Sequence, residues 1–531
     1  MTTRTRSFWH WGFEEDFPDA AAREAVARQA AFMIPSLGTP RAEPLPEIAN
    51  VKVRASRLEI PSALAHCATR DDRERILHAS GKGYRDVLRA FRGDLPYAPD
   101  VVVFPERDED LAATFEWCSR VGAALVPFGG GTSVVSGVTY DGDRPIASVD
   151  LARLRRLVDV DETSRLVRAQ AGATGPDLEA QLAERGLSLR FYPQSFEVST
   201  LGGWIATRAG GHFATGYTHI DDMVSSVRMM SPGGAFETKT FPASGAGPDP
   251  NRLVLGSEGA LGVVTEATLR AFHRPTYRAQ CTVFFRDVRH AVDAARGVAQ
   301  AGLFPSNCRV LDKNEALLSG VSMDRCALLL AFESADHELD AWLERAVKIA
   351  VRAGGEPEPL RYKRAGKKQR GTAGGAETYR AAFLRGPYMQ SALIPYGVMV
   401  DTFETACTWS RFDALDREVR AALRAITNDV MIAMRFSHVY PDGPAPYYTF
   451  GVPAERGREL EQHERLKSAV SDALGRVGAT ITHHHAVGRL HRPWYERERP
   501  AVFGEVLRAA KRVLDPSSIM NPGVLIEERG A

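Results

Sequence analysis

The chain has 531 residues, of which 44% are hydrophobic and 25% are charged, and this length favours two or three domains because a single core rarely extends beyond about 250–300 residues. Lys and Arg (67) balance Asp and Glu (66), so the charge does not favour nucleic-acid binding. No apolar run is long enough to span a bilayer, and the first residues lack the apolar core of a secretory signal. The six cysteines stand singly, so we expect a cytoplasmic protein with reduced thiols.

The hydrophobic periodicity changes along the chain. In chain order it predicts a helix at 20–34, a strand at 101–104, a helix at 108–121, a strand at 124–128, a strand-like segment at 165–173, a helix near 175–185 and a strand-like segment at 252–271. The strand, helix and strand from 101 to 128 predict a β-α-β crossover. After Pro275 longer amphipathic helices alternate with short strands, which indicates a second domain.

A glycine-rich segment, PFGGGTSVVSG at 127–137, directly follows the predicted strand 124–128. Free backbone N–H groups in such a loop bind phosphate oxygens, and ligands of open α/β sheets bind where strands end. A tight turn between core strands explains the segment equally well. A Walker loop requires Gly-Lys-Ser/Thr and a Rossmann fingerprint opens a helix, and the segment has neither feature.

Two more glycine-rich segments follow, YPQSFEVSTLGGWIATRAGG at 192–211 and GSEGALGVVTEATLR at 256–270. The order and spacing of the three resemble the FAD-binding domain of the vanillyl-alcohol oxidase family. The resemblance implies an α+β fold, in which a two-subdomain FAD-binding domain of the vanillyl-alcohol oxidase (PCMH) type adjoins a separate mixed α/β cap domain. The implied limits are an N-terminal helical segment at 1–94, the FAD-binding domain at 95–275, the cap or substrate domain at 276–480, and a C-terminal segment at 481–531 that returns to the FAD domain.

The resemblance also implies the contacts with FAD, whose diphosphate would lie at the first loop and whose adenosine and ribityl portions would lie at the other two. The implied contacts are Pro127, Phe128, Gly129, Gly130, Gly131, Thr132, Ser133, Gln194, Ser195, Ser199, Thr200, Gly203, Thr207, Arg208, Ala209, Glu258, Gly259, Gly262, Val263 and Val264. Some relatives link FAD covalently to a histidine at the position of Thr132, so we expect non-covalent FAD.

Three adjacent histidines stand in the segment ITHHHAVGRLHRPWY at 481–495. Adjacent residues of a strand or helix do not point the same way, and no nearby Cys, Asp or Glu completes a ligand set, so we expect no metal. A polar loop between domains is one explanation. A cluster of proton donors and acceptors beside a reaction centre is the other, because imidazole exchanges protons near neutral pH.

The run HHHAVGRL resembles the corresponding run of alkyl-dihydroxyacetonephosphate synthases, as do SFWHWG, CRVLD, ETACTW and SHVYPDGPAPYYTF. The resemblance implies that Tyr447 transfers a proton, that His483, His484 and His485 set its ionisation, and that Arg309 is also needed. The implied reaction exchanges the acyl chain of acyl-dihydroxyacetone phosphate for a fatty alcohol on reduced FAD, without net oxidation, in ether lipid synthesis. A core aromatic side chain is the plainer interpretation of Tyr447.

Two positions depart from the pattern of these synthases. Gln390, our candidate substrate-binding residue, stands in place of an arginine, which is a strong bidentate partner for phosphate or carboxylate. Phe191 stands in place of a histidine at the flavin rim. A FAD-linked oxidase or dehydrogenase of a 2-hydroxy acid or related alcohol therefore remains an alternative, as does a non-catalytic flavin-binding protein. We further expect a small-molecule lipid substrate, a homodimer, and peripheral membrane contact through residues 20–34 or 361–370.

Overall fold

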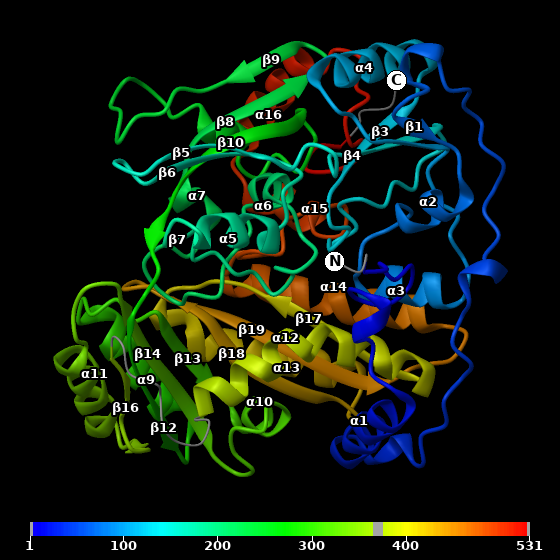
Figure 1. Cartoon of the computed structure of the whole chain (residues 1–531). Helices are drawn as coiled ribbons and strands as arrows, with labels where there is room; N and C mark the ends of the chain where they lie inside the picture. Colours follow the sequence, from blue (N-terminus) through cyan, green and yellow to red (C-terminus); the bar gives the residue numbers. More distant parts are fainter. Residues whose placement is uncertain (1–3, 365–374, 528–531) are drawn as a thin grey trace.

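The computed structural model describes residues 4–364 and 375–527. Two parts pack against each other (Figure 1). One part carries the glycine loop on two sheets, and the other is built on a single large sheet. The expected α+β fold, with a two-sheet nucleotide-binding part and a separate cap, is therefore confirmed.

The first sheet has the strand order β1-β2-β4-β3. Its elements are β1 (Ala68–Thr69), β2 (Val101–Val103), α4 (Asp108–Val121), β3 (Ala124–Phe128) and β4 (Ile146–Asp150). Strands β2, β4 and β3 are parallel and mostly buried, as is usual for parallel strands. The predicted crossover through α4 is confirmed, with β4 between the two strands that α4 connects.

The second sheet is antiparallel, in the order β5-β6-β10-β8-β9. Its strands are β5 (Leu157–Asp161), β6 (Leu166–Gln170), β8 (Val224–Ser231), β9 (Gly234–Glu237) and β10 (Val263–Arg270), and its neighbours are α5 (Gly175–Ala183), β7 (Leu187–Ser188), α6 (Leu201–Thr207), α7 (Ile220–Met223), α8 (Asn251–Val254) and β11 (Phe272–His273). The prediction of a strand throughout 252–271 was wrong at its start. Helix α8 occupies that start, and Gly256 and Gly259 interrupt extended backbone with φ of 81° and 75°.

The third sheet, in the cap, is eight-stranded and antiparallel, in the order β15-β12-β14-β13-β18-β19-β17, with β16 beside β12. Its strands are β12 (Tyr277–Phe285), β13 (Asn307–Leu311), β14 (Cys326–Ser334), β15 (Glu356–Pro357), β16 (Arg361–Lys363), β17 (Val398–Glu404), β18 (Met431–Val439) and β19 (Pro444–Pro453). Its helices are α9 (Val288–Gln300), α10 (Lys313–Leu318), α11 (Asp340–Arg352), α12 (Gly375–Leu393), α13 (Phe412–Ile426) and α14 (Glu459–Val477).

Successive residues of the cap strands face two different cores, because side chains alternate along a strand. Leu328 and Leu330 of β14 belong to the core shared with α9, α11, α13 and α14, whereas Leu329 packs with Tyr379 of α12. The same alternation places Tyr448 of β19 in the first core. Its neighbour Tyr447 is thereby left on the face that carries α12.

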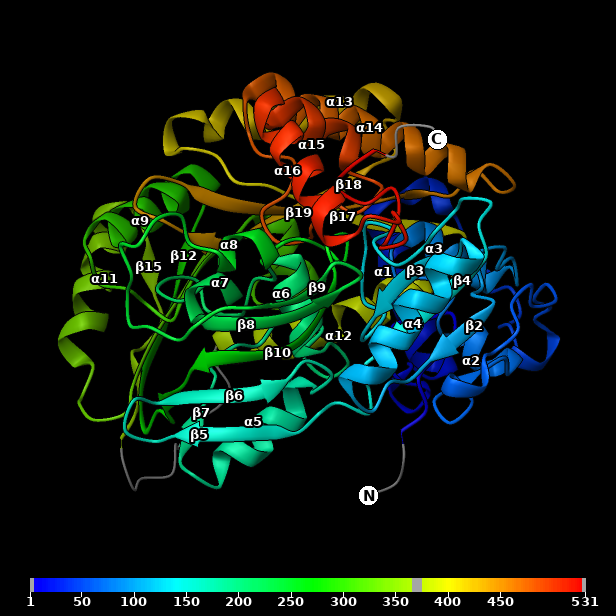
Figure 2. The same cartoon turned by 90° about the horizontal axis from the view of Figure 1, so that it is seen from above.

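The two ends of the chain join both parts. Helix α1 (Ala20–Met33) confirms the helix predicted at 20–34, and an extended segment leads from it along the outside of the molecule (Figure 1) to α2 (Asp72–Leu77) and α3 (Tyr84–Phe91). At the other end, α15 (Arg492–Glu498) and α16 (Ala501–Leu514) lie over the nucleotide-binding part (Figure 2). The chain then pairs with β3, since the Leu125 N–H donates to the Ile519 carbonyl at 2.8 Å.

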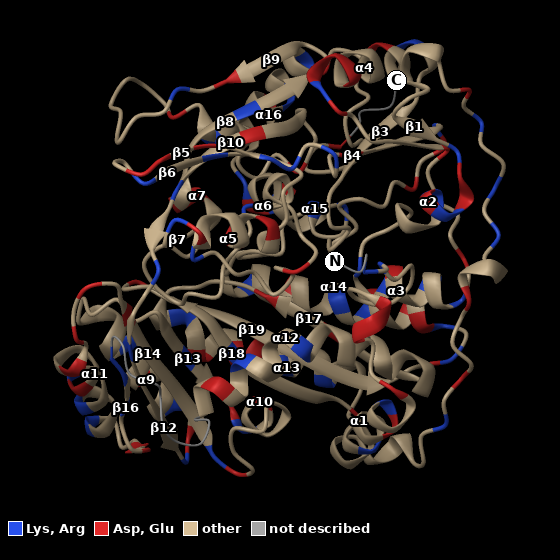
Figure 3. Ribbon diagram, viewed as in Figure 1, with Lys and Arg blue, Asp and Glu red and all other residues tan. Residues whose placement is uncertain are grey.

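Charged residues of both signs are interspersed over both parts (Figure 3). Within the described ranges no helix combines the length and the apolarity needed to cross a bilayer. The candidate membrane-contact segment 361–370 begins with strand β16 over Arg361–Lys363, and residues 365–370 lie outside the described residues.

Candidate active site

A cavity lies between the glycine loop and the α12 face of the cap sheet. The glycines allow the loop to pack closely against neighbouring segments and also keep its backbone accessible from the cavity. A Cβ atom on Gly129 would lie 2.5 Å from Thr200 Oγ1, and one on Gly130 would lie 2.2 Å from the Val198 carbonyl oxygen. These two positions therefore have to be glycine so that the loop can pack against residues 198–200, which belong to the second glycine-rich segment.

The predicted FAD contacts meet at this cavity. All of them line it except Arg208. Arg208 has a positive φ of 51°, and its half-exposed guanidinium pairs with Asp221 at 2.8 Å, away from the cavity. Positive φ at an arginine is not visible in the sequence, so the direction of this side chain could not be predicted.

Two cations, Lys82 and Arg6, lie beside the loop, and Arg6 Nη1 lies 4.0 Å from a carboxylate oxygen of Asp150. The Lys82 ammonium group lines the cavity and donates to the carbonyls of Ser7 and Phe8, both at 3.1 Å. Burial, and then the charge of Arg6, lower the pKa of Lys82 to about 7. Arg6 itself donates to the Gly130 carbonyl at 3.1 Å. Two cations, open backbone and neighbouring hydroxyl groups suit a diphosphate, so the residues present fit FAD.

Glu258 joins the third glycine-rich segment to the histidine loop. Its carboxylate accepts hydrogen bonds from the N–H groups of Val487 (2.9 Å) and Gly488 (2.7 Å). Burial raises the pKa of Glu258 to about 7. The residue lines the cavity as predicted, but its carboxylate binds main chain of the C-terminal segment.

The two departures from the synthase pattern lie in different surroundings. Gln390, on α12, lines the cavity. Phe191 is 1% exposed and packs against Trp204 with ring centroids 5.1 Å apart, and it is not among the residues that line the cavity. Phe191 therefore belongs to the core of the nucleotide-binding part and not to the rim of the cavity, where the resemblance placed it.

Glu404, at the end of β17, holds the three histidines in place. Its buried carboxylate accepts hydrogen bonds from the backbone N–H groups of His483 (2.8 Å), His484 (3.1 Å) and His485 (3.0 Å). Burial alone would raise the pKa of Glu404, but the neighbouring His484 and the other two imidazoles lower it well below its usual value. Glu404 thus stays ionised, and being ionised it can only accept hydrogen bonds.

The imidazoles of His219, His483 and His484 form a hydrogen-bonded chain, and a backbone carbonyl next to His219 fixes which nitrogen of His219 carries the hydrogen. His219 Nδ1 lies 3.1 Å from the Arg208 carbonyl, which can only accept, so this nitrogen carries the hydrogen. Burial lowers the pKa of His219, so its other nitrogen, Nε2, is bare. That atom lies 3.1 Å from His483 Nε2, and the Tyr440 hydroxyl lies 2.8 Å from the same nitrogen of His483. With a hydrogen on His483 Nε2 both neighbours can accept, and the Tyr440 hydroxyl then donates to Thr218 Oγ1 at 3.1 Å.

The same reasoning continues to His484. Burial lowers the pKa of His483 well below its usual value, so His483 is neutral and its Nδ1 accepts. His484 Nδ1 lies 3.0 Å from that atom and 3.2 Å from a carboxylate oxygen of Glu404, and both neighbours require a hydrogen on it. These assignments follow from the hydrogen-bond network. These two contacts engage Nδ1 of His484 and not its Nε2.

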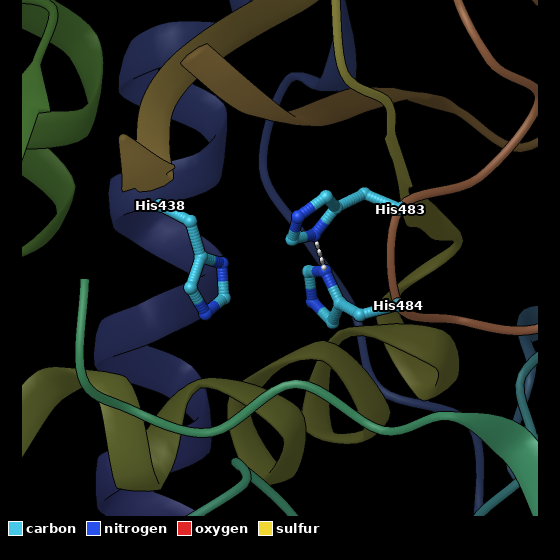
Figure 4. A group of neighbouring side chains, drawn as sticks. All are labelled: His438, His483 and His484. Carbon is cyan, nitrogen blue, oxygen red and sulfur yellow. Dashed lines mark hydrogen bonds between the residues drawn. The ribbon is translucent and has the colours of Figure 1, made fainter. Parts of the chain in front are cut away.

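His438, on β18, faces this pair from the cap sheet (Figure 4). One ring nitrogen of each of His438, His483 and His484 lies within 4.8 Å of the others. The loop is neither strand nor helix, so the argument from side-chain direction does not apply to these histidines. The expectation of no metal stays a prediction. His484 and His485 line the cavity together with His438, whereas His483 lies behind them.

Tyr447 faces the cavity from β19. Its hydroxyl donates to Thr402 Oγ1 at 3.1 Å, and its ring meets that of His485 edge-on with centroids 5.3 Å apart. Burial raises the pKa of Tyr447 to about 12, and the charge of Arg435, whose guanidinium carbon lies 3.9 Å from the ring centroid, opposes this rise. An arginine, rather than a histidine, is therefore the main group that favours the phenolate.

The structure adds several residues to those predicted. His438, Glu404, Arg435 and His219 contact predicted site residues directly. The first two lie within the segments SHVYPDGPAPYYTF and ETACTW, so the sequence contained a signal for them. No motif marked Arg435 or His219.

Comparisons with known proteins agree with this geometry. The sequence model of the family described as "FAD binding domain" matches residues 99–238, and that described as "FAD linked oxidases, C-terminal domain" matches residues 274–525. The alkyldihydroxyacetonephosphate synthase of Caenorhabditis elegans is 30% identical over 86% of this chain and 81% of its own length.

Solved structures show the same fold. An alkyldihydroxyacetonephosphate synthase structure superposes with a TM-score of 0.80 at 23% identity, covering 97% of each chain. A p-cresol methylhydroxylase structure superposes with a TM-score of 0.69 at 13% identity, covering 97% of this chain and 98% of the other. The predicted vanillyl-alcohol oxidase (PCMH) type of fold is confirmed. With FAD as its cofactor, the chain belongs to the alkyldihydroxyacetonephosphate synthase family of FAD-linked enzymes.

Proposed function

We propose that this protein is an alkyldihydroxyacetonephosphate synthase, which exchanges the acyl chain of acyl-dihydroxyacetone phosphate for a fatty alcohol. The observation that carries this proposal is that Tyr447, His484 and the glycine loop line the same cavity. Family membership supports the same reaction. Its products are an alkyl-dihydroxyacetone phosphate and a fatty acid, so the net reaction involves no oxidation or reduction.

The cofactor and the protein divide the chemistry. When bound, reduced FAD supplies a nucleophilic ring nitrogen for displacement at the substrate carbon that bears the ester. Tyr447 takes a proton from the substrate and returns it, with Arg435 favouring its phenolate form. At neutral pH the phenol holds its proton, since its pKa is raised to about 12 by burial. A base must therefore accept that proton first, and we assign this role to His484, which lines the same cavity with its ring centroid 6.0 Å from that of Tyr447.

The remaining residues position these groups. Glu404 fixes the histidine loop through three backbone N–H groups, and Thr402 orients the hydroxyl of Tyr447. The glycine loop and the predicted FAD contacts that line the cavity would bind the cofactor non-covalently, since Thr132 offers no imidazole for a covalent link.

A direct assay tests the proposal. The purified holoenzyme is incubated with palmitoyl-dihydroxyacetone phosphate, with and without hexadecanol, and the released palmitate is measured. We expect release that depends on the alcohol, together with formation of the ether product. Bleaching of the flavin by a 2-hydroxy acid, with turnover on an artificial acceptor and no ether product, would instead identify a dehydrogenase. A protein that binds FAD and does neither would be a non-catalytic flavin-binding protein.

The domain limits, the location and the assembly belong to the same proposal. We retain 1–94, 95–275, 276–480 and 481–531 as limits, and limited proteolysis tests them. A lipid substrate supports contact of a cytoplasmic protein with membrane surfaces, and Phe32 on α1, 79% exposed, suits such contact. Flotation with lipid vesicles tests the contact, and light scattering tests the homodimer implied by family likeness.

A further inference from the structure

We infer that Arg309 and Arg435 together form the subsite for the phosphate group of the substrate, in place of the arginine that Gln390 replaces. This inference rests on the proposed function, which supplies a phosphomonoester substrate. No motif of the sequence marked Arg435, and the resemblance gave Arg309 no specific role.

The two guanidinium groups lie on one face of the cap sheet. Arg309 on β13 and Arg435 on β18 both line the cavity. Their Cζ atoms lie 5.2 Å and 5.7 Å from the centroid of the same ring, that of Phe383 on α12. Arg309 is 1% exposed and Arg435 is 8% exposed. Two like charges are thus buried next to the same aromatic ring.

The protein neutralises only one of these charges. Arg435 Nη1 donates to Glu315 Oε1 at 2.9 Å. Arg309 donates to the His212 carbonyl at 2.6 Å and to the Tyr379 hydroxyl at 3.3 Å, both neutral acceptors, and it forms no ion pair with any residue that the structure describes. A buried cation without a counter-charge is unfavourable. An anionic ligand in the cavity would remove this imbalance.

The hydrogen bonds of the two arginines are also incomplete. The Nε atoms of both are buried and have no hydrogen-bond partner among the described residues. An arginine has five N–H donors. A ligand with several acceptor oxygens, drawn in by the charge, would use the donors that face the cavity.

Proximity to Tyr447 favours the phosphate group of the substrate. Arg435 lies over the ring of Tyr447. In acyl-dihydroxyacetone phosphate only two carbons and one oxygen separate the reacting carbon from phosphorus, so the phosphate has to bind near the groups that act on that carbon. Guanidinium groups bind phosphate in bidentate fashion. The carboxylate of the departing fatty acid is the other oxyanion of the reaction, and the test separates the two.

The test measures equilibrium binding to the holoenzyme without turnover. Inorganic phosphate, dihydroxyacetone phosphate, dihydroxyacetone and octanoate are titrated separately, with calorimetry and the flavin spectrum as readouts. We expect phosphate and dihydroxyacetone phosphate to bind and to compete, and the other two to compete poorly. Arg309→Gln and Arg435→Gln should each weaken the binding of dihydroxyacetone phosphate about tenfold or more. Arg309→Lys, which keeps the positive charge but loses the paired N–H donors of the guanidinium group, should have a smaller effect.

A matched control removes a nearby charge outside the cavity. Arg380, exposed on α12, lines a neighbouring cavity and not this one, so Arg380→Gln should bind dihydroxyacetone phosphate within about twofold of the unmodified protein. Circular dichroism and FAD content check the fold of each variant, and the corresponding lysine variant, Arg309→Lys or Arg435→Lys, replaces a glutamine variant that does not fold. Unchanged binding by the Arg309 and Arg435 variants would overturn the inference, as would displacement of dihydroxyacetone phosphate by octanoate as readily as by phosphate. Phosphate binding that depends on both arginines without any acyl exchange would preserve the subsite and reject the proposed function.

Discussion

His219 Nε2 lies 3.1 Å from His483 Nε2, although the two residues are 264 positions apart in the chain. His219 belongs to the nucleotide-binding part and His483 to the C-terminal loop. This contact connects the two segments. His219 is itself fixed by the Arg208 carbonyl. Together with the Tyr440 hydroxyl, 2.8 Å from the same nitrogen of His483, it favours a hydrogen on His483 Nε2, and this arrangement in turn sets which nitrogen of His484 carries hydrogen.

In the variant His219→Ala, the hydrogens of His483 and His484 should therefore no longer be restricted to one ring nitrogen. We expect kcat to fall about tenfold or more with little change in KM, because an imidazole in the wrong tautomer cannot accept the proton. Nitrogen chemical shifts of isotope-labelled histidine report the tautomers directly. His273→Ala, at an exposed position of β11, is the control. Unchanged nitrogen shifts for His484 in the His219 variant would contradict the assignment.

Tyr447→Phe should abolish the exchange reaction while preserving the fold. The variant loses one proton-transfer group, which typically contributes a factor of about 10²–10⁴, and one hydrogen bond to Thr402, worth about 1 kcal/mol of unfolding free energy. Palmitate release and thermal unfolding measure the two effects.

The adjacent Tyr448→Phe is the control for this experiment. Its hydroxyl donates to Asp416 at 3.1 Å, on the opposite side of the sheet. We expect a similar small loss of stability and nearly full activity. Equal activity of the two variants would refute the role of Tyr447.

Buried imidazoles make the folded state sensitive to acid. Burial lowers the pKa of His485 to about 3 and that of His438 well below its usual value. Their pKa values rise to about 6.5 in the unfolded chain. The stability they contribute is therefore fully present above pH 6.5 and is lost as the pH falls from 6.5 through the folded pKa values, by up to about 1.4 kcal/mol per pH unit for each group. Denaturant unfolding between about pH 7.5 and 5 measures this slope.

His485→Asn isolates one of these groups. The slope should become shallower in this variant below pH 6.5, whereas His273→Asn should keep the original slope, because His273 is exposed. A full slope in the His485 variant would show that this imidazole is protonated in the folded state.

Gly130→Ala should impair FAD binding through packing. Its Cβ atom would lie 2.2 Å from the Val198 carbonyl oxygen, so residues 198–200 have to move. We expect a purified protein with much less flavin, measured from its visible spectrum. Gly245→Ala, where no atom lies within 4 Å of the added Cβ, should retain all of its flavin.

The bound flavin should be dissociable. Thr132 stands in the glycine loop where a covalent link would need an imidazole, so precipitation with acid should leave FAD in the supernatant. A yellow pellet, with flavin fluorescence on the denatured chain, would instead indicate a covalent bond to another residue.

Much of the nucleotide-binding part could be predicted because its signals are local. The strand and helix limits at 124–128 and 108–121 agree with β3 and α4, since apolar runs and turn residues act over a few positions. The strand predicted at 252–271 failed where Gly256 and Gly259 turn the backbone. Glycine permits such a turn without requiring it.

By itself the sequence determined the glycine loop, the crossover beside it and the presence of Tyr447 and the histidines, because these features depend on residue types and on spacings within short segments. Only the tertiary structure showed why Tyr447, which the resemblance had indicated, faces the cavity while Tyr448 does not. It also showed that Arg435 lies over the ring of Tyr447 and that His219 contacts His483. The physical reason is that side-chain direction depends on strand register and on contacts between segments hundreds of residues apart, and the residues of a single segment do not contain that information.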